Sequence, residues 1–444
     1  MAFLKNRRVQ VVGLLSLASG MPLGWTFTTL QFWLVSLGIP KGTIGLLSAV
    51  SLPWSLKFLW SPLVDRYALP WPGRRRSWVV VAQLALAAMF GVLAGYALHL
   101  GRLRSAGAPL ASGEVATAIG LLALGVTFLS ATQDIAYDAY CVEVLHPEEQ
   151  GPASGLKVMY YRLGMLVAGA LAVSASDWLP WPVLFALLGA LFAAFTGITM
   201  LAPEPERPAA PPRSLARAVW EPLTAFFQRP GALPVLLFLV LYKYGDNMAG
   251  TMVNPFLKDL CFRNAEAGAA VKTLGTIATI AGAGIGAAVM SRIGLGRALW
   301  AFGLAQAGAN LLYAGAALSR AAPMDVALCG TLPPLSAVTR AWVYVGIAGE
   351  WGAQGMATSA LLALILRACD KRYSATQYAL LSSLFGLGRT LSGVPSGYLA
   401  QRLGYPLFFA AAVAAAVPGL LLLQRIAPLG QREVPGAEAP AAET

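Results

Sequence analysis

The sequence predicts an all-α membrane protein in which twelve transmembrane helices form two six-helix bundles. Hydrophobic residues make up 57% of the 444-residue chain and charged residues only 12%, about half the charged fraction of a soluble domain. Apolar runs of the ~20 residues that cross a hydrocarbon core recur along the whole chain. A Pro-rich, charged segment separates six of these runs from the other six. Together these features exclude a soluble globular protein.

Charged and turn-forming residues bound each apolar run and so set the expected spans. In chain order we expect helices at 9–37, 42–64, 77–98, 115–145, 153–175, 181–201, 233–258, 266–290, 297–318, 338–367, 374–398 and 405–424. The expected domains are a first bundle at 1–201, a cytoplasmic linker with a surface helix at 202–232, a second bundle at 233–424 and a disordered cytoplasmic tail at 425–444.

The net charge of +12 indicates membrane topology rather than nucleic-acid binding, because the basic residues cluster beside the expected span ends. With the N-terminus in the cytoplasm, 18 Lys and Arg residues flank the spans on that side and 8 on the other. This bias places both termini inside. Lys5, Arg7 and Arg8 precede a long apolar run, which we interpret as a retained first span rather than a cleaved signal peptide.

The two halves share a weak repeat in the loop after the second span of each. SPLVDR (61–66) and GRRR (73–76) follow the second span, and SRIGLGR (291–297) follows the eighth. Such a repeat indicates the major facilitator architecture, in which two six-helix bundles are related by an axis along the membrane normal. The cytoplasmic loop motif then comprises Asp65, Arg66, Gly73, Arg74 and Arg75, although topology alone also accounts for such charges.

Nine short motifs, in the same order, resemble those of AmpG-type muropeptide permeases. They are GMPLG (20–24), TLQ (29–31), KFLWSPLVDRY (57–67), GRRR (73–76), ATQDI (131–135), YRLG (161–164), LYKYGD (241–246), KTLG (272–275) and SATQYALLS (374–382). The resemblance implies a major facilitator transporter of the bacterial inner membrane that imports anhydromuropeptides, with or without a peptide, in symport with protons. Related acetyl-CoA transporters share parts of the pattern, so another solute such as acetyl-CoA or a sugar is the alternative.

A charged cluster lies in the fourth and fifth expected spans, where each ion is costly unless it is paired or faces water. Asp134 and Asp138 are four residues apart and share one helix face. At ~1.5 Å per residue, the depths of Lys157 and Arg162 interleave with those of the aspartates. We expect Arg162 to pair with Asp134 or Asp138, and Lys157 with Asp138 or Glu143. These pairs form a ladder of charges between the fourth and fifth spans. The ladder serves proton coupling or gating, or it only links the two helices.

A second set of charges lies in the other half. Glu350 and Arg389 reach similar depths, ~25 Å and ~22 Å from the cytoplasmic ends of their spans, and are expected to pair. Lys243 and Asp246 are three residues apart on the seventh span and can pair with each other. We expect Asp246, Glu350 and Arg389, like Asp134, Asp138 and Arg162, to serve proton coupling or gating, with Asp138 and Glu350 as the preferred proton carriers.

Amides, ammonium groups and indole rings within the spans suit a sugar–peptide substrate. Lys57 either attracts a substrate carboxylate or pairs with a distant acidic residue. Gln133 either binds a sugar or packs as a helix amide. Two tryptophans deeper than the rest are candidates for stacking on a sugar ring. The candidate substrate-binding or cavity residues are Gln31, Lys57, Gln133, Lys243, Gln354, Trp25 and Trp54.

Cysteine and histidine usage argues against an enzyme. The four cysteines are scattered without metal-ligand spacing, and we expect all of them to have packing roles. His99 and His146 fall in loops on opposite sides, and no Ser/His/Asp set accompanies them. We therefore expect no catalytic site, cofactor or metal, and by analogy with this architecture a monomer.

Overall fold

The computed structural model of this protein consists of helices joined by turns and short connections. It describes residues 6–39, 50–67, 71–107, 112–205, 214–228, 231–320, 324, 329 and 333–429. By length and hydropathy, seven of the described helices can each cross a membrane, or up to nine if two bent helix pairs each count as one span. The all-α transmembrane class is therefore confirmed.

The first half of the chain forms long helices at five of the first six expected spans. The first span consists of α1 (Arg7–Gly24), the π-helical turn η2 (Trp25–Thr29) and α2 (Leu30–Ser36). The others are α6 (Arg74–Ser105), α7 (Ser112–Val144), α8 (Pro147–Leu166) continued by η5 (Val167–Leu171) and α9 (Ala172–Ala175), and α10 (Trp181–Met200).

The second expected span, 42–64, is not one continuous helix. Its described part consists of α4 (Leu52–Leu56), the 3₁₀ turn η4 (Lys57–Leu59) and α5 (Ser61–Arg66). Each of the two α-helices has a proline in its first turn, at Pro53 and Pro62. Proline lacks the N–H of a helix interior, so the helix restarts there. Residues 40–49 lie outside the described part.

The second half of the chain begins with α11 (Leu215–Phe227), the helix expected within the linker. The spans that follow are α12 (Ala232–Leu241), α13 (Tyr244–Asp259), α14 (Asn264–Gly268) with η6 (Ala269–Leu274), α15 (Gly275–Ile293), α16 (Leu295–Leu318), α17 (Ala337–Ala368), the 3₁₀ turn η8 (Lys371–Tyr373) and α18 (Ser374–Ile426). Gly404 breaks α18 with a φ of 70°, a conformation that glycine adopts without a Cβ clash, and so separates the last two expected spans. The domain boundaries stay predictions, and residues 430–444 of the expected tail lie outside the described part.

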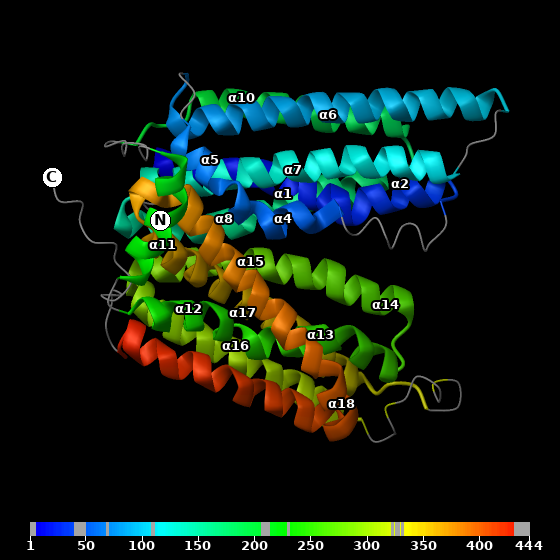
Figure 1. The fold of residues 1–444 in the computed structure, drawn as a ribbon. Helices are drawn as coiled ribbons and strands as arrows, with labels where there is room; N and C mark the ends of the chain where they lie inside the picture. Colours follow the sequence, from blue (N-terminus) through cyan, green and yellow to red (C-terminus); the bar gives the residue numbers. More distant parts are fainter. Residues whose placement is uncertain are drawn as a thin grey trace.

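The helices form two groups that lie side by side. Figure 1 shows α1 to α10 in one group, here called the first group, and α12 to α18 in a second group. The start of α1 and the end of α18 lie at the same end of the molecule, which we call the terminal face. The other end, where α2 and α14 lie, is called the far face.

Apolar packing joins the two groups at the terminal face and separates them toward the far face. One buried core combines residues of both groups, such as Leu156 of α8 and Leu361 of α17. Toward the far face each group has its own core, around Trp25 in the first group and Phe256 in the second. Gly155 of α8 meets α15 so closely that an added Cβ would overlap Ala287. Among the described residues, the shared core thus closes the groups against each other at the terminal face.

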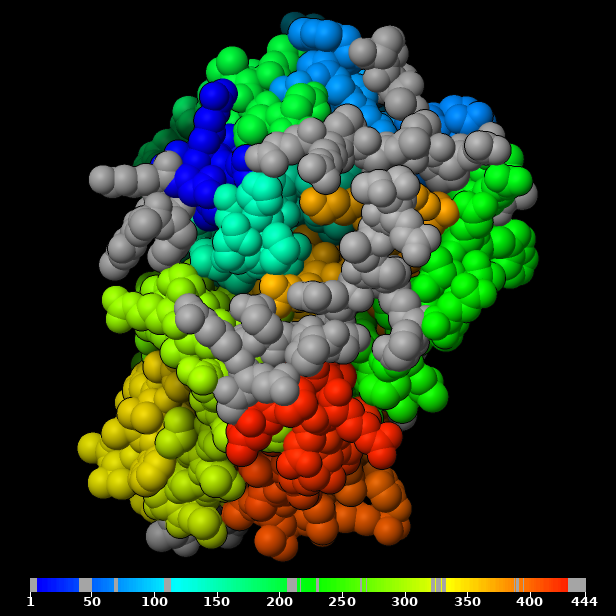
Figure 2. Space-filling model, turned by 90° about the vertical axis from the view of Figure 1, so that its left-hand side faces the viewer, coloured from blue at the N-terminus to red at the C-terminus, as the bar shows by residue number. Residues whose placement is uncertain are grey.

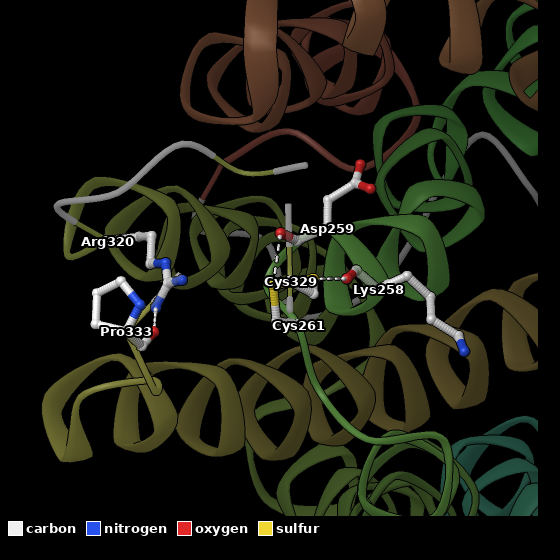
Figure 3. The surroundings of a disulfide bond; sticks show 6 residues. All are labelled: Lys258, Asp259, Cys261, Arg320, Cys329 and Pro333. Atoms are coloured by element: carbon white, nitrogen blue, oxygen red, sulfur yellow. Dashed lines mark hydrogen bonds between the residues drawn. A yellow bond between two sulfur atoms is a disulfide. The ribbon is translucent and has the colours of Figure 1, made fainter. Parts of the chain in front are cut away.

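A disulfide bond at the far face corrects one prediction. Cys261, just after α13, is bonded to Cys329 in the connection between α16 and α17. Figure 3 shows Lys258 and Asp259 beside it; the Cys329 sulfur lies 3.8 Å from the Lys258 carbonyl oxygen. The expectation that all four cysteines only pack was therefore wrong, because scattered spacing in sequence says nothing of proximity in the fold. Cys141 and Cys369 are free and buried, as expected.

Candidate functional site

One carboxylate in the first group binds two lysines. Asp138 of α7 lies 2.5 Å from the Nζ of Lys157 in α8 and 3.2 Å from the Nζ of Lys57 in η4. Asp138 and Lys157 are each 6% exposed. The predicted pairing of Lys157 with Asp138 is confirmed, and Lys57 takes the second of its two expected roles, pairing with a distant acidic residue. We call Lys57, Asp134, Asp138, Lys157 and Arg162 the first charge cluster.

The first charge cluster has two further members, Asp134 and Arg162. Asp134 is 8% exposed and accepts a hydrogen bond from the hydroxyl of Ser19 in α1. Arg162 lies further along α8, and its Nη1 is 3.8 Å from the Met165 sulfur. Its pairing with an aspartate stays a prediction.

Lys157 also reaches across to the second group. Its Nζ donates a hydrogen bond to the Tyr378 hydroxyl of α18 at 3.0 Å. It also lies 4.7 Å from the centre of the Tyr378 ring and 4.9 Å from that of Tyr137. Because both rings face the ammonium, they supplement its ion pair with cation–π attraction. Our sequence reasoning did not assign Tyr378 a role, although it belongs to the motif SATQYALLS.

A second charge cluster lies in the second group and consists of Lys243, Asp246, Glu350, Tyr313 and Thr358. The Nζ of Lys243 lies 3.6 Å from Asp246 and donates to the Thr358 hydroxyl at 2.8 Å. The Tyr313 hydroxyl donates to Glu350 at 3.4 Å, and the Glu350 carboxyl lies next to that of Asp246. Lys243, Asp246 and Glu350 are each at most 3% exposed.

A break in the seventh span positions this second charge cluster. Lys243 lies between the end of α12 at Leu241 and the start of α13 at Tyr244, and Asp246 is in the first turn of α13. A carboxylate in the first turn of a helix interacts favourably with the N-terminal end of the helix dipole. The predicted pair Lys243–Asp246 is confirmed. The predicted partner of Glu350, Arg389, is on α18, but its side chain lies outside the described residues.

A third set of polar residues joins the groups at the terminal face, and we call it the terminal lock. Arg75 of α6 lies 2.6 Å from both Asp65 of α5 and Glu143 of α7, and it donates to the Ser374 hydroxyl of α18 at 2.9 Å. Asp65 accepts hydrogen bonds from the backbone and hydroxyl of Thr376, at 2.8 and 2.6 Å. Glu143, an expected alternative partner of Lys157, belongs to this lock instead.

The loop motif expected from sequence is only partly brought together. Arg74 joins the terminal lock, because its Nη2 donates to the backbone oxygen of Asp65 at 2.7 Å. Gly73 precedes α6 with a φ of 147°. The guanidinium of Arg66 lies 5.6 Å from the centre of the Tyr67 ring.

The expected substrate residues differ in their access. Trp54 is half-buried; its ring stacks on Phe27 at 6.2 Å and its Nε1 donates to Ser130. Trp25, in contrast, is fully buried and packs edge-on against Phe90 and Phe185. The expectation that Trp25 stacks on a sugar is therefore not met, because core aromatic rings surround it.

The amides also fall into two classes. Gln31 of α2 is exposed, and Gln354 of α17 is half-buried one turn beyond Glu350. Gln133 is 1% exposed, and its Oε1 has no hydrogen-bond partner among the described residues. A buried amide oxygen without a hydrogen-bond partner lowers the stability of the folded protein unless a ligand or water binds it. Among the described residues, no three His, Cys, Asp or Glu side chains come together as a metal site.

Comparison with solved structures shows the fold. The human organic anion transporter MFSD10 matches with a TM-score of 0.64 at 16% identity, over 94% of this chain and 99% of that one. A bacterial homologue of the iron transporter ferroportin in an outward-facing state matches with a TM-score of 0.66 at 16% identity, over 95% and 99%. The fold is thus that of a major facilitator transporter, a multi-pass membrane protein.

Comparison of sequences defines the family. The chain is 39% identical over 418 residues to the anhydromuropeptide permease of Escherichia coli K12, covering 94% of this chain and 79% of that protein. It is 31% identical to a putative transporter AmpG 4 of Rickettsia conorii, over 94% and 96%. Residues 9–178 also match the family model for acetyl-coenzyme A transporter 1. The chain belongs to the anhydromuropeptide permease (AmpG) family.

Replacing Asp138 with Asn tests the ion pairs of the first charge cluster. The change leaves the buried ammonium of Lys157 and the half-buried one of Lys57 without their shared carboxylate, so we expect a loss of about 3–5 kcal/mol in stability. Thermal unfolding of the purified protein in detergent measures it. Asp177→Asn, at an exposed position, is the matched control and should leave the transition unchanged. The double variant Asp138→Asn with Lys157→Gln should recover part of the lost stability, because it also removes one of the unpaired ammonium groups. Equal unfolding temperatures for Asp138→Asn, Asp177→Asn and the double variant would contradict the pairing.

Proposed function

We propose that this protein imports anhydromuropeptides into the cytoplasm of a bacterium by proton-coupled alternating access. The observation that carries the proposal is the 39% identity to an anhydromuropeptide permease over 94% of the chain. The two buried charge clusters and the terminal lock support it, because paired ions within spans are typical of transport and proton pathways. The protein is then a transporter of the inner membrane rather than an enzyme, and by analogy with its fold it acts as a monomer.

We propose further that the terminal face is cytoplasmic. Two independent observations support this orientation. Lys and Arg residues flank the spans 18 to 8 in favour of this side. The disulfide lies at the far face, and disulfides form and persist in oxidising compartments such as the periplasm.

In this orientation the described conformation is closed to the cytoplasm. Opening inward requires that α18 separate from α5, α6 and α8, which breaks the contacts Asp65–Thr376, Arg75–Ser374 and Lys157–Tyr378. Because these contacts are buried and mutually supporting, they set a barrier that substrate and proton binding must lower. We assign Asp65, Arg74 and Arg75 to the cytoplasmic gate.

Charge balance favours the second charge cluster as the proton site. Among the described side chains, two carboxyl groups, Asp246 and Glu350, share one lysine there, so a single proton brings these three groups to neutrality. In the first charge cluster Asp138 already has two ammonium partners and needs no proton for balance. We therefore propose the pair Asp246–Glu350, rather than Asp138, as the proton carrier.

The residues with partial access define the proposed substrate contacts. Trp54 offers an indole face to a sugar ring, and Gln31 and Gln354 offer amides to hydroxyl groups. Lys57 and Arg162 are half-buried cations that attract the carboxylates of a peptide. Gln133 and Lys243 are buried, and we propose that they bind substrate only after the groups move.

A second candidate substrate follows from the family model that matches residues 9–178, which is described as an acetyl-coenzyme A transporter. Acetyl-CoA carries phosphates, which Lys57 and Arg162 would also attract. The match covers the first group only, so the muropeptide remains the preferred substrate.

Uptake into right-side-out vesicles tests the substrate and the coupling. We expect labelled anhydromuropeptide to accumulate in vesicles that contain the protein and an uncoupler to abolish the accumulation. Vesicles without the protein are the control, and labelled acetyl-CoA is tested in parallel. Absence of muropeptide uptake would remove the proposed substrate, and uptake that resists the uncoupler would remove the proton coupling.

Replacing Glu350 with Gln tests the proton site. Without the second carboxyl group, we expect uncoupler-sensitive accumulation to fall by roughly tenfold or more. Exchange of labelled for unlabelled substrate across the membrane should continue, because it needs no net proton movement. Glu148→Gln, at an exposed position, serves as the matched control. Normal accumulation by the Glu350 variant would refute the assignment.

Labelling from outside the cell tests the orientation. We treat outer-membrane-permeabilised cells with an impermeant reductant and an impermeant polyethylene glycol maleimide. Cys261 and Cys329 should each gain a label only after reduction, while the buried Cys141 and Cys369 should gain none. A variant with both disulfide cysteines replaced by Ser should stay unlabelled. Labelling that requires broken cells would place the far face in the cytoplasm.

A further inference from the structure

Helix α11 (Leu215–Phe227) lies across the membrane spans rather than along them. Its segment Arg217–Phe227 makes an angle of 94° with the segment Ala232–Asp259 that follows. Because that span crosses the bilayer, α11 lies roughly in the plane of the membrane at the terminal face. Figure 2 looks onto this face, and the green residues of the α11–α12 region lie along its right-hand edge. The helix thus lies at the rim of the terminal face.

One side of α11 is fixed to the protein. Ala218, Phe226 and Pro222 are buried. The Glu221 carboxylate accepts a hydrogen bond from the Tyr373 hydroxyl at 2.6 Å, and the Pro222 carbonyl accepts one from Gln377 at 3.1 Å. These contacts hold α11 against the start of α18 and set the direction in which its other sides face.

A second side of α11 is apolar and exposed. Val219 is 37% exposed, Trp220 66% and Phe227 59%. At 100° per residue these side chains, together with the half-buried Leu223, cover one sector of the helix. No described residue covers this sector. An exposed apolar sector next to a docked one requires an occupant, because large apolar groups rarely gather on a surface that faces only water.

A third side of α11 is polar. Arg217, Thr224 and Gln228 are exposed, and the Nε of Arg217 lies 3.7 Å from Glu221. Around the helix, the side docked on the protein is therefore followed by the exposed apolar side and then by the polar side. An in-plane helix at the rim meets the same order in its surroundings, namely the protein, the acyl chains and the water. The next exposed apolar residues along the chain, Leu233 and Leu237, already lie on a span.

We propose that α11 is an interfacial helix whose apolar sector, Val219, Trp220, Leu223 and Phe227, inserts into the boundary between headgroups and acyl chains of the adjoining leaflet. Trp is enriched at this depth because its ring is apolar and its N–H is polar. Arg217 then lies at the level of the lipid phosphates. In the orientation proposed above, this is the cytoplasmic leaflet. Because the docked side of α11 holds Tyr373 and Gln377, lipid contact anchors the start of α18, next to the terminal lock.

Collision accessibility of a nitroxide tests the insertion. Single cysteines replace Phe227 in the apolar sector and its neighbour Gln228 in the polar one. Each variant is spin-labelled and placed in nanodiscs of phosphatidylethanolamine and phosphatidylglycerol. We expect oxygen, which concentrates in acyl chains, to reach the label at 227 several-fold better than a water-soluble nickel chelate does. The preference at 228 should be reversed. The native free cysteines are buried and should contribute little signal.

A second pair, Trp220→Cys and Thr224→Cys, repeats the comparison in case the first pair does not fold. Equal access of the nickel chelate to the apolar and polar positions would overturn the proposal, because both sides would then face water. Protection of position 227 from both reagents would overturn it too, because a protein surface rather than lipid would cover the sector. Neither outcome depends on the transported substrate, so the result is separate from the proposed transport function.

Discussion

The closed terminal face depends on the contact between the Asp65 carboxylate and the start of α18. Asp65 accepts hydrogen bonds from the backbone N–H groups of Ala375 and Thr376 and from the Thr376 hydroxyl, so it caps α18 from a different helix. Negative charge is favoured at that position by the helix dipole. Arg75 balances the charge on the other side of the carboxylate at 2.6 Å. A buried carboxylate is stable only when it is paired and hydrogen-bonded. The buried state of Asp65 is therefore stable only while the first and second groups of helices are in contact.

The first turn of α18 extends this connection to several elements at once. Ser374 meets Arg75 and Glu143, Gln377 meets α11, and Tyr378 meets Lys157. Successive residues of a helix point about 100° apart, so one turn can contact elements on different sides. A movement of α18 therefore disturbs the terminal lock, the linker helix and the first charge cluster together. No comparable polar contact between the groups occurs among the described residues near the far face, where each group has its own core.

Sequence reasoning predicted the features that depend on local spacing. The apolar runs predicted the all-α transmembrane class, and depth counting along two adjacent spans limited the partner of Lys157 to Asp138 or Glu143, of which Asp138 is the one observed. The three-residue spacing of Lys243 and Asp246 gave the second pair. These predictions succeeded because the helix fixes the relative positions of residues along one or two adjacent spans.

The features that sequence reasoning missed depend on contacts between distant segments. Asp65 meets Thr376 across 311 residues. Pairing with a distant acidic residue was one of the two roles expected of Lys57, but the identity of that residue, Asp138, depends on the packing of η4 beside α7. The disulfide likewise joins residues 68 positions apart. Helical periodicity carries no information on which spans are neighbours, so depth alone could not choose among equally deep partners. Trp25 shows the same limit, because its depth was predictable and its enclosure by Phe90 and Phe185 was not.

The two charge clusters differ in a way that bears on how transport could be coupled. Lys57, Lys157 and Arg162 outnumber the two aspartates of the first cluster, whereas Lys243 is outnumbered by Asp246 and Glu350 in the second. An anionic solute reduces the excess positive charge of the first cluster, and a proton reduces the excess negative charge of the second. Under the proton-coupled import proposed above, each cluster thus favours a different one of the two species, the anionic solute and the proton. Lys157 also binds Tyr378 of the second group, so a solute that draws Lys157 toward itself weakens a contact that holds the terminal face closed. Binding and opening are then linked through one ammonium group.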